Sequence, residues 1–537
     1  MSYFRNTCIV VLLLITGIQF TYAAKVSGVV FEDTNQNLEL DPGERGVPNV
    51  IVSNQQDVVL TDHQGRYVLP VHDEMIVFIT KPSGYSTPLD EHNLPQFYYI
   101  HQPQGSPDLK YPGVRPTGPL PESVDFPLFR ASEPDTFQAI VLSDPQPRNQ
   151  QEINYIRDDV VAELVGTEAA FGITLGDVMF DNLSLYQRQN AIFSAIGIPF
   201  YNVPGNHDMN YYAPDDHYSL ETFKSIFGPP YYAFEYGKVH FIVLDDIVWN
   251  NPPDEDGYYI EKLGREQLTW LEEHLKHVPG DRLLVLSAHA PFVALDSVEV
   301  KINIEDGREL FRILQGREKA LMLAGHYHLL ERILVDRDLG WQGEQPIEHI
   351  TCSAVSGSWW LGSKDERGIP VADQRDGTPN GYHIFSFRGT DYSQRFKPAN
   401  RDDDFQIRIS VPKGVLARHD LSTSRIIANV FNATPRWQIE YQWDDSGFRP
   451  MHRVLTRDPY VRQLYTEDSL FAMPWLKPQN SLHLWEAPMP DHAPLGVHKI
   501  VVHARDGQGR QFEAARIIEI VADGEVTVLD GDHSEED

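Results

Sequence analysis

Five short polar motifs in the middle of the chain carry the residue types that bind metals and transfer protons. They are Asp-Pro-Gln at 144–146, Gly-Asp at 176–177, Gly-Asn-His-Asp at 205–208, His-Ala-Pro at 289–291 and Gly-His-Tyr-His at 325–328. Alone, each motif is weak, because one Asp or His after a strand is more often a hydrogen-bonded structural residue than a ligand. Together they are informative, since the strand ends of an α/β fold converge on one crevice.

Carboxylate, amide and imidazole groups in one crevice suit the hydrolysis of a phosphate ester. This reaction needs neutralised phosphate oxygens and a nucleophile that exists at neutral pH, and two cations about 3.5–4 Å apart can supply both. Histidine and carboxylate ligands favour Mn, Fe or Zn over Mg or Ca. The motifs therefore predict a centre with two divalent transition metals.

In order and residue type, the motifs resemble those of the calcineurin-like metallophosphoesterases, over roughly half of the chain. The flanking regions resemble the β modules attached to some exported bacterial members of that family. The resemblance implies a four-layer α/β/β/α sandwich with both metals at the strand ends. The ligands that it implies are Asp144, Gln146 and His328 for the first metal, Asp177 as a bridge, and Asn206, His289 and His326 for the second.

The same resemblance implies a role for the residues next to the ligands. His207 is expected to protonate the leaving group while metal-bound hydroxide attacks phosphorus, and Asp208 is expected to orient the imidazole of His207. Asp181 is expected to support the metal shell from behind. Gln146 departs from the family pattern, because an amide replaces the usual histidine and loosens the first site. Phe180 stands where purple acid phosphatases have an iron-binding tyrosine, which argues against an Fe(III)–tyrosinate centre.

The elements around the motifs predict an α/β catalytic domain over 135–396. Apolar runs typical of buried strands alternate there with stretches that favour helices. The expected strands include 137–142, 170–175, 239–244 and 282–287, and the expected helices are 152–165, 184–196 and 264–276.

Both flanks of this domain are rich in short alternating strands. Residues 25–100 predict a small antiparallel β domain that resembles prealbumin-like or carboxypeptidase-regulatory-like modules, and 397–529 predict a second β domain. The proline- and glycine-rich stretch 101–134 is expected to be a connector, and 530–537 form an acidic tail.

Oxygen-bearing side chains in the N-terminal region have the spacing of a calcium loop. They are Asp33, Asn35, Asn37, Asp41 and Glu44. Leu38 stands where that pattern has glycine, and Pro42 is incompatible with the usual exit helix. A structural calcium site and a solvated acidic turn both remain open at this point.

The composition limits the partners of the protein. The 537 residues include 45 Lys and Arg against 77 Asp and Glu, a formal net charge of −32. Because nucleic-acid backbones are bound by basic surfaces, this charge argues against binding to a nucleic-acid scaffold. Small phosphorylated substrates stay compatible with it, since bound cations reverse the field locally.

Residues 1–24 predict a secretory signal peptide. One basic residue precedes an apolar run at 8–20, and small residues stand at 23–24. The alternative is an uncleaved anchor, but the run is shorter than the roughly 20 apolar residues that span a bilayer. We therefore expect an exported protein, periplasmic or secreted, that is not an integral membrane protein.

Two classes of function follow from these patterns. The first is an exported metal-dependent hydrolase of phosphate mono- or diesters, with phosphorylated small molecules, lipid head groups and phosphoproteins all open as substrates. The second is a cell-surface protein whose β domains bind glycan or protein while the middle domain is an inert scaffold. Tryptophans of the C-terminal region, such as Trp475 and Trp485, could serve the second class, although they also suit sandwich cores.

Overall fold

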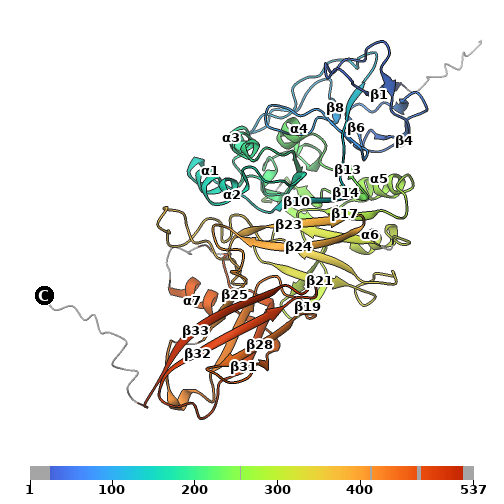
Figure 1. The fold of residues 1–537 in the computed structure, drawn as a ribbon. Coiled ribbons are helices and arrows are strands. Elements are labelled where there is room, and N and C mark those ends of the chain that lie inside the picture. The colour runs from blue at the N-terminus through green and yellow to red at the C-terminus, as the bar shows by residue number, and fades with distance from the viewer. Residues whose placement is uncertain are drawn as a thin grey trace, which may run out of the picture.

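A computed structural model places a central α/β domain between two β domains (Figure 1). The residues that it describes are 24–253, 255–317, 319–411, 414–467, 473 and 475–523. Apart from Ala24, the predicted signal peptide lies outside these residues, as does the predicted acidic tail. In the part of the chain that is described, no helix has both the length and the apolar character needed to cross a bilayer.

Two sheets form the middle layers of the central domain. The first has the order β12 (Phe200–Val203), β11 (Phe171–Leu175), β10 (Thr136–Leu142), β23 (Gly381–Arg388) and β24 (Asp391–Pro398). The second has the order β13 (Tyr232–Tyr236), β14 (Val239–Val243), β17 (Leu283–Ser287), β20 (Ala320–Ala324), β22 (Ile347–Thr351) and β21 (Glu331–Val335). Strands β10, β11 and β12 are parallel, as are β14, β17, β20 and β22, so their carboxyl ends share one edge.

Helices cover the outer faces of both sheets. Helix α1 (Gln150–Ile156) continues through a π turn at 157–161 into α2 (Ala162–Leu164), and with α3 (Tyr186–Phe193) it packs on the first sheet. Helices α5 (Arg265–Leu275) and α6 (Gly307–Ile313) pack on the second sheet. Along β10, Ala139 and Val141 enter the core between the sheets while Ile140 and Leu142 face the helices, as the period of two requires. The predicted four-layer α/β/β/α architecture is thus confirmed.

Three smaller elements belong to the same domain. They are the helix α4 (Glu221–Phe227), the hairpin of β15 (Ile247–Asn250) and β16 (Tyr258–Glu261), and the hairpin of β18 (Val293–Asp296) and β19 (Glu299–Ile302).

The N-terminal β domain extends further than the sequence predicts. One sheet contains β2 (Arg45–Gly46), β1 (Lys25–Glu32), β9 (Phe126–Arg130), β7 (Tyr85–Ser86) and β5 (Arg66–Pro70). The other contains β4 (Val58–Leu60), β3 (Ile51–Ser53), β6 (Met75–Ile79) and β8 (Tyr98–His101). Because β9 pairs in parallel with β1, the end of the expected 101–134 connector belongs to this domain. Sequence reasoning missed this five-residue strand because prolines are frequent around it.

The C-terminal β domain also has two sheets. One has the order β25 (Ile407–Ser410), β27 (Arg425–Val430), β31 (Asn480–Pro488) and β30 (His452–Arg457). The other has the order β26 (Val415–Ala417), β33 (Gln511–Val521), β32 (Gly496–Arg505), β28 (Gln438–Trp443) and β29 (Arg449–Pro450). Trp443 and Trp485 are buried in its core, whereas Trp475 is 47% exposed near α7 (Pro459–Glu467). Core packing thus accounts for two of the tryptophans.

Candidate metal centre

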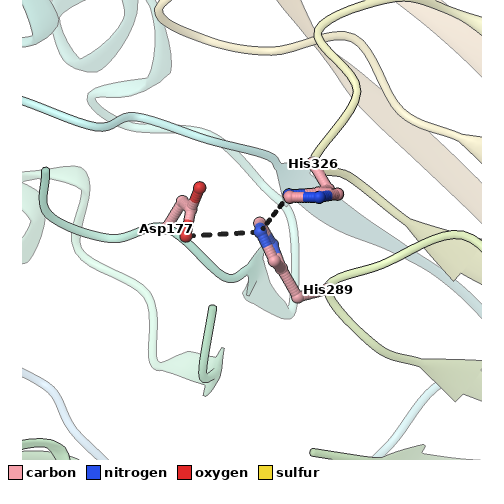
Figure 2. A group of neighbouring side chains, drawn as sticks. All are labelled: Asp177, His289 and His326. Atoms are coloured by element: carbon pink, nitrogen blue, oxygen red, sulfur yellow. Dashed lines mark hydrogen bonds and ion pairs between the residues drawn. The ribbon is translucent and has the colours of Figure 1, made fainter. Parts of the chain in front are cut away.

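The loops after five parallel strands bring most of the predicted ligands to one edge of the two sheets. Asp144 follows β10, Asp177 follows β11, Asn206 follows β12, His289 follows β17, and His326 and His328 follow β20. Ligand atoms of Asp177, His289 and His326 all lie within 4.8 Å of one another (Figure 2). Residues far apart in sequence therefore meet in one cluster, in which Asp177 and His289 are buried and His326 is partly buried.

His289 stands at the middle of this cluster, and its hydrogen bonds decide which nitrogen is protonated. Its Nδ1 lies 2.9 Å from the Leu175 carbonyl oxygen, which can only accept, so Nδ1 carries the hydrogen. In the neutral ring Nε2 therefore holds the lone pair, and it faces Asp177 Oδ1 at 3.2 Å, Asn206 Oδ1 at 3.1 Å and His326 Nδ1 at 3.1 Å. Lone pairs that converge in this way fit a cation between them.

A second group of atoms surrounds Asp144 and fits another cation. His328 Nδ1 donates to the Gly357 carbonyl, so its Nε2 is also a lone pair, 3.6 Å from Asp144 Oδ1. Within the described residues, His328 Nε2 and Gln146 Oε1 are buried and have no hydrogen-bond partner. Because buried polar atoms are normally paired, these two unpartnered atoms fit the binding of a cation. The Gln146 amide nitrogen donates to Asp177, the predicted bridging ligand, and the role of Gln146 at the first metal stays a prediction.

The backbone is held in an unusual conformation at the ligand positions. Five predicted ligands have left-handed φ values between 43° and 71°, namely Asp144, Gln146, Asp177, His326 and His328. Non-glycine residues rarely adopt this region, and such strain gathers at functional sites. Glycines make room for the same side chains, since a Cβ at Gly205 would lie 2.3 Å from Asp177 Oδ1 and one at Gly325 would lie 2.5 Å from Asp144 Oδ2.

Burial and mutual charge shift the pKa values of these groups. Burial lowers the pKa of His328 to about 3, which keeps the imidazole neutral, as metal binding requires. Burial also raises the pKa of Asp144. For His289, burial opposes protonation, but the carboxylate of Asp177 raises its pKa to about 10. In the absence of a cation a proton would thus neutralise the cluster, in the position that a metal would take.

His207 is oriented by a different carboxylate from the one predicted. Its Nδ1 lies 2.7 Å from Asp181 Oδ1, and the ring of Phe180 stacks on the imidazole with centroids 4.2 Å apart. Burial tends to lower the pKa of His207, but the charges of Asp177 and Asp181 raise it overall. The partner that holds this imidazole is therefore Asp181.

The prediction that Asp208 orients His207 is wrong. The carboxylate of Asp208 accepts hydrogen bonds from the backbone of Val178, Met179 and Gly205, and from the Tyr186 hydroxyl at 2.8 Å. Although the two residues are adjacent in the 3-10 turn Asn206–Asp208, His207 bonds to Asp181 and Asp208 bonds to these other groups. Asp208 instead connects the loop after β11 to the loop after β12 by hydrogen bonds. Asp181 bonds to His207, and its expected support of the metal shell stays a prediction.

Two acidic residues that sequence reasoning missed, Glu261 and Asp246, and an aromatic residue, Trp359, lie next to the centre. Glu261 Oε1 lies 3.4 Å from His326 Nε2, and buried Asp246 accepts from the backbone nitrogens of His289 and Ala290. Trp359 stacks on the His328 ring with centroids 3.8 Å apart. No motif marks Glu261, because it reaches the centre from the β15–β16 hairpin, which carries none of the predicted ligands.

Comparison with protein-family models agrees with this geometry. The model described as calcineurin-like phosphoesterase matches residues 138–330, and those described as its N terminal and C terminal match 34–111 and 348–512. The chain belongs to the calcineurin-like phosphoesterase family. Membership makes the protein a phosphate-ester hydrolase by family and implies dependence on divalent metal.

Two proteins that this calcineurin-like phosphoesterase resembles are distant in sequence. A protein of Arcobacter nitrofigilis described as a probable glycerophosphodiester phosphodiesterase is 30% identical over 161 residues, which cover 29% of this chain and 55% of that protein. The match therefore spans about half of the relative's length. A purple acid phosphatase from yellow lupin seeds is 12% identical, with a TM-score of 0.34 over 65% of this chain and 67% of its own. A TM-score this low supports no conclusion.

In this calcineurin-like phosphoesterase the predicted calcium loop is closed by its own hydrogen bonds. Asp33 accepts from the backbone nitrogens at 36 and 38, Glu44 accepts from those at 34 and 41, and the amides of Asn35 and Asn37 donate to Asp41. A solvated turn accounts for these bonds without an ion. The calcium site stays a prediction.

Proposed function

We propose that this calcineurin-like phosphoesterase hydrolyses phosphate mono- or diesters at a centre of two divalent transition metals, Mn, Fe or Zn. The observation that carries the proposal is the set of converging ligand atoms: Nε2 of His289 beside Asp177 and Asn206 oxygens, and the buried, unpartnered Nε2 of His328 and Oε1 of Gln146. Bound there, the cations would neutralise phosphate oxygens and make a water acidic enough to attack at neutral pH.

Within this proposal, His207 supplies the proton for the leaving oxygen. With Nδ1 hydrogen-bonded to Asp181, the other ring nitrogen is the one available for transfer, and Phe180 limits rotation of the ring. The backbone nitrogen of His207 donates to Asp177 Oδ1 at 2.9 Å, which fixes the donor relative to the predicted bridging carboxylate. A positioned acid of this kind contributes about 10²–10⁴-fold to a rate.

The substrate class and location belong to the same proposal. The description of the Arcobacter relative favours small-molecule phosphodiesters among the open substrate classes. Family membership favours the enzyme over the binding protein with an inert scaffold. So does the presence of a possible ligand side chain at each predicted ligand position. We further propose export, on the signal-peptide pattern of residues 1–24, which N-terminal sequencing of the mature protein tests.

Metal analysis and two variants test the catalytic proposal. Purified protein is expected to hold two equivalents of transition metal. Asp177→Asn and His207→Asn are expected to lose turnover of a chromogenic phosphomonoester and a phosphodiester assayed with Mn, about 10²-fold or more for His207→Asn. Tyr258→Phe is the control, because that tyrosine is exposed and outside the centre. Undiminished turnover in both centre variants would refute the assignment.

A further inference from the structure

A cavity of about 500 Å³ lies beside the metal centre, between the catalytic and C-terminal domains. Its walls come from the β18–β19 hairpin, the chain from Tyr327 to Glu331, Arg375, and the residues that begin β31. Figure 1 shows β19 and β21 at the boundary with the C-terminal sheets. A volume of this size is typical of small-molecule sites.

Specific hydrogen bonds between the two domains hold the walls of this cavity. The Asn480 amide donates to the Ser297 carbonyl at the hairpin tip, 2.6 Å away, and the backbone nitrogen of Gln479 donates to the Arg375 carbonyl at 2.8 Å. Arg375 in turn donates from its backbone to the His328 carbonyl at 3.2 Å. The cavity is therefore built by contacts that also reach the metal-ligand loop.

Two charged groups in the wall have spare hydrogen-bonding capacity. Glu331 is only 3% exposed, and its carboxylate receives one long bond, from the Leu295 backbone at 3.4 Å. Among the charged contacts of the described residues, none joins Glu331 to a cation. The Arg375 guanidinium donates to the Tyr327 and Lys477 carbonyls at 3.3 and 3.4 Å rather than to a carboxylate. A ligand that both accepts and donates would satisfy both groups.

The charge of the wall selects the chemistry of that ligand. When Glu331 is ionised, it and Asp296 balance Arg375 and Lys301, so the lining has no net formal charge to prefer an anion or a cation. The other polar lining groups are hydroxyls and amides, from Ser297, Tyr327, Asn303, Gln479 and Asn480. We propose that this cavity binds a polyhydroxylated group, that is, a sugar or another polyol, because each hydroxyl can donate to one wall group and accept from another.

A chain of polar contacts connects the cavity wall to the metal centre. The Tyr327 hydroxyl donates to Asn303 Oδ1 at 2.8 Å, Asn303 donates to Glu261 at 2.5 Å, and Glu261 lies 3.4 Å from His326 Nε2. The polyol can therefore be the alcohol part of the phosphate ester or a separate sugar. Only the first source rests on the proposed function.

Binding of free polyols to the full chain tests the proposal without hydrolysis. The probes are glycerol, glucose, galactose and N-acetylglucosamine, titrated by calorimetry. Glu331→Gln keeps the shape but removes the charged acceptor, and Gln479→Trp fills the cavity. Arg436→Ala is the matched control, because Arg436 lines a different cavity of about 480 Å³ between the same domains, which includes the starts of β17, β20 and β22.

At least one probe is expected to bind wild type and Arg436→Ala with equal affinity. Its affinity for Glu331→Gln and for Gln479→Trp is expected to be about tenfold lower, because the first variant loses a bond to a charged group and the second fills the space. Absence of binding at millimolar concentration, or binding unchanged by Glu331→Gln and Gln479→Trp, would overturn the proposal. If Gln479→Trp does not fold, the near-isosteric Glu331→Gln decides alone.

A kinetic arm identifies the source of the polyol. If it is part of the substrate, Gln479→Trp lowers kcat/KM about tenfold for glycerol phosphate or a sugar phosphate relative to a chromogenic phosphomonoester. If the sugar is separate, binding weakens but this ratio does not change. Both results support the cavity as a polyol site. Failure of all hydrolysis would refute the proposed function and leave the calorimetric result valid.

Discussion

The two β domains that flank the catalytic domain are attached to it in different ways. The N-terminal domain shares one continuous hydrophobic core with the catalytic domain, in which Phe78 contacts Trp270 and Phe97 contacts Tyr232. The C-terminal domain has a core of its own around Trp443 and Trp485. Its contacts with the catalytic domain are small apolar clusters, such as Leu330 with Phe396 and Phe431, and polar bonds.

This difference in attachment gives the two flanking domains different roles in stability and function. A shared core means that the N-terminal and catalytic domains are expected to unfold together, whereas a domain with its own core can unfold separately. The C-terminal domain instead lies beside the reaction centre, where Trp475 contacts Trp359 and the Tyr465 hydroxyl donates to the Asp373 carbonyl at 2.9 Å. We infer that one flank stabilises the enzyme and the other shapes its site.

The largest predicted effect comes from a substitution that weakens the contact between the N-terminal and catalytic domains. Lys81 and Glu133 form an ion pair with side chains 7% and 5% exposed, and Lys81 Nζ also donates to the Glu235 carbonyl at 2.6 Å. Lys81→Met leaves a buried carboxylate without its cation, so the free energy of unfolding should fall by about 3–5 kcal/mol. Urea unfolding measures the loss.

The loss should appear in a single transition that contains both domains. Lys276→Met is the control, because its ion pair with Glu273 is solvent-exposed and should change stability by less than about 1 kcal/mol. Separate melting of the N-terminal domain in either variant would contradict the shared core.

The next effect comes from a buried charge at the C-terminal boundary. Burial raises the pKa of Glu331 from 4.5 to about 7. The folded state then binds a proton more tightly than the unfolded state, so stability should fall as pH rises from 4.5 to 7. Over this window the loss is at most about 3 kcal/mol.

Glu331→Gln should remove this part of the pH dependence, because glutamine does not ionise. Unfolding measured at pH 4.5, 6 and 8 compares the two slopes. Equal slopes in wild type and variant would show that Glu331 does not titrate in this range. The buried Glu331 at the C-terminal boundary would then differ less from the ion-paired Lys81 at the N-terminal boundary.

A third effect concerns His207, the proposed proton donor, rather than stability. Asp181→Asn removes the carboxylate that holds His207, and kcat should fall about 10- to 100-fold, as for other residues that orient a site imidazole. The pH dependence of kcat should shift as well, because the imidazole loses a nearby negative charge. Asp208→Asn is the comparison variant, and it should lower stability first, since Asp208 accepts three backbone hydrogen bonds. Equal kinetic and stability effects in both variants would contradict these separate roles.

The sequence predicted what depends on local pattern and missed what depends on packing. Apolar runs located the buried strands, and polar residues after those strands located the predicted ligands, because parallel strands end at a common edge. The partner of His207 could not be predicted in this way, since Asp208 is its neighbour in sequence, whereas Asp181 is 26 residues away and reaches the imidazole only in the folded chain. Strand β9 was missed because its pairing with β1 joins segments almost one hundred residues apart.

The smallest predicted effect tests whether the C-terminal domain reaches the reaction centre. Trp475 meets Trp359 edge-on with centroids 6.3 Å apart, and Trp359 stacks on the predicted ligand His328. An aromatic pair of this kind contributes about 0.5–1.5 kcal/mol, so Trp475→Ala should weaken binding of the first metal about two- to tenfold. Trp437→Ala is the control, because Trp437 stacks on Phe512 within the C-terminal domain. Metal titration should then separate the two variants: if both weaken the first metal equally, the effect comes from general loosening of the C-terminal domain and not from contact across the boundary.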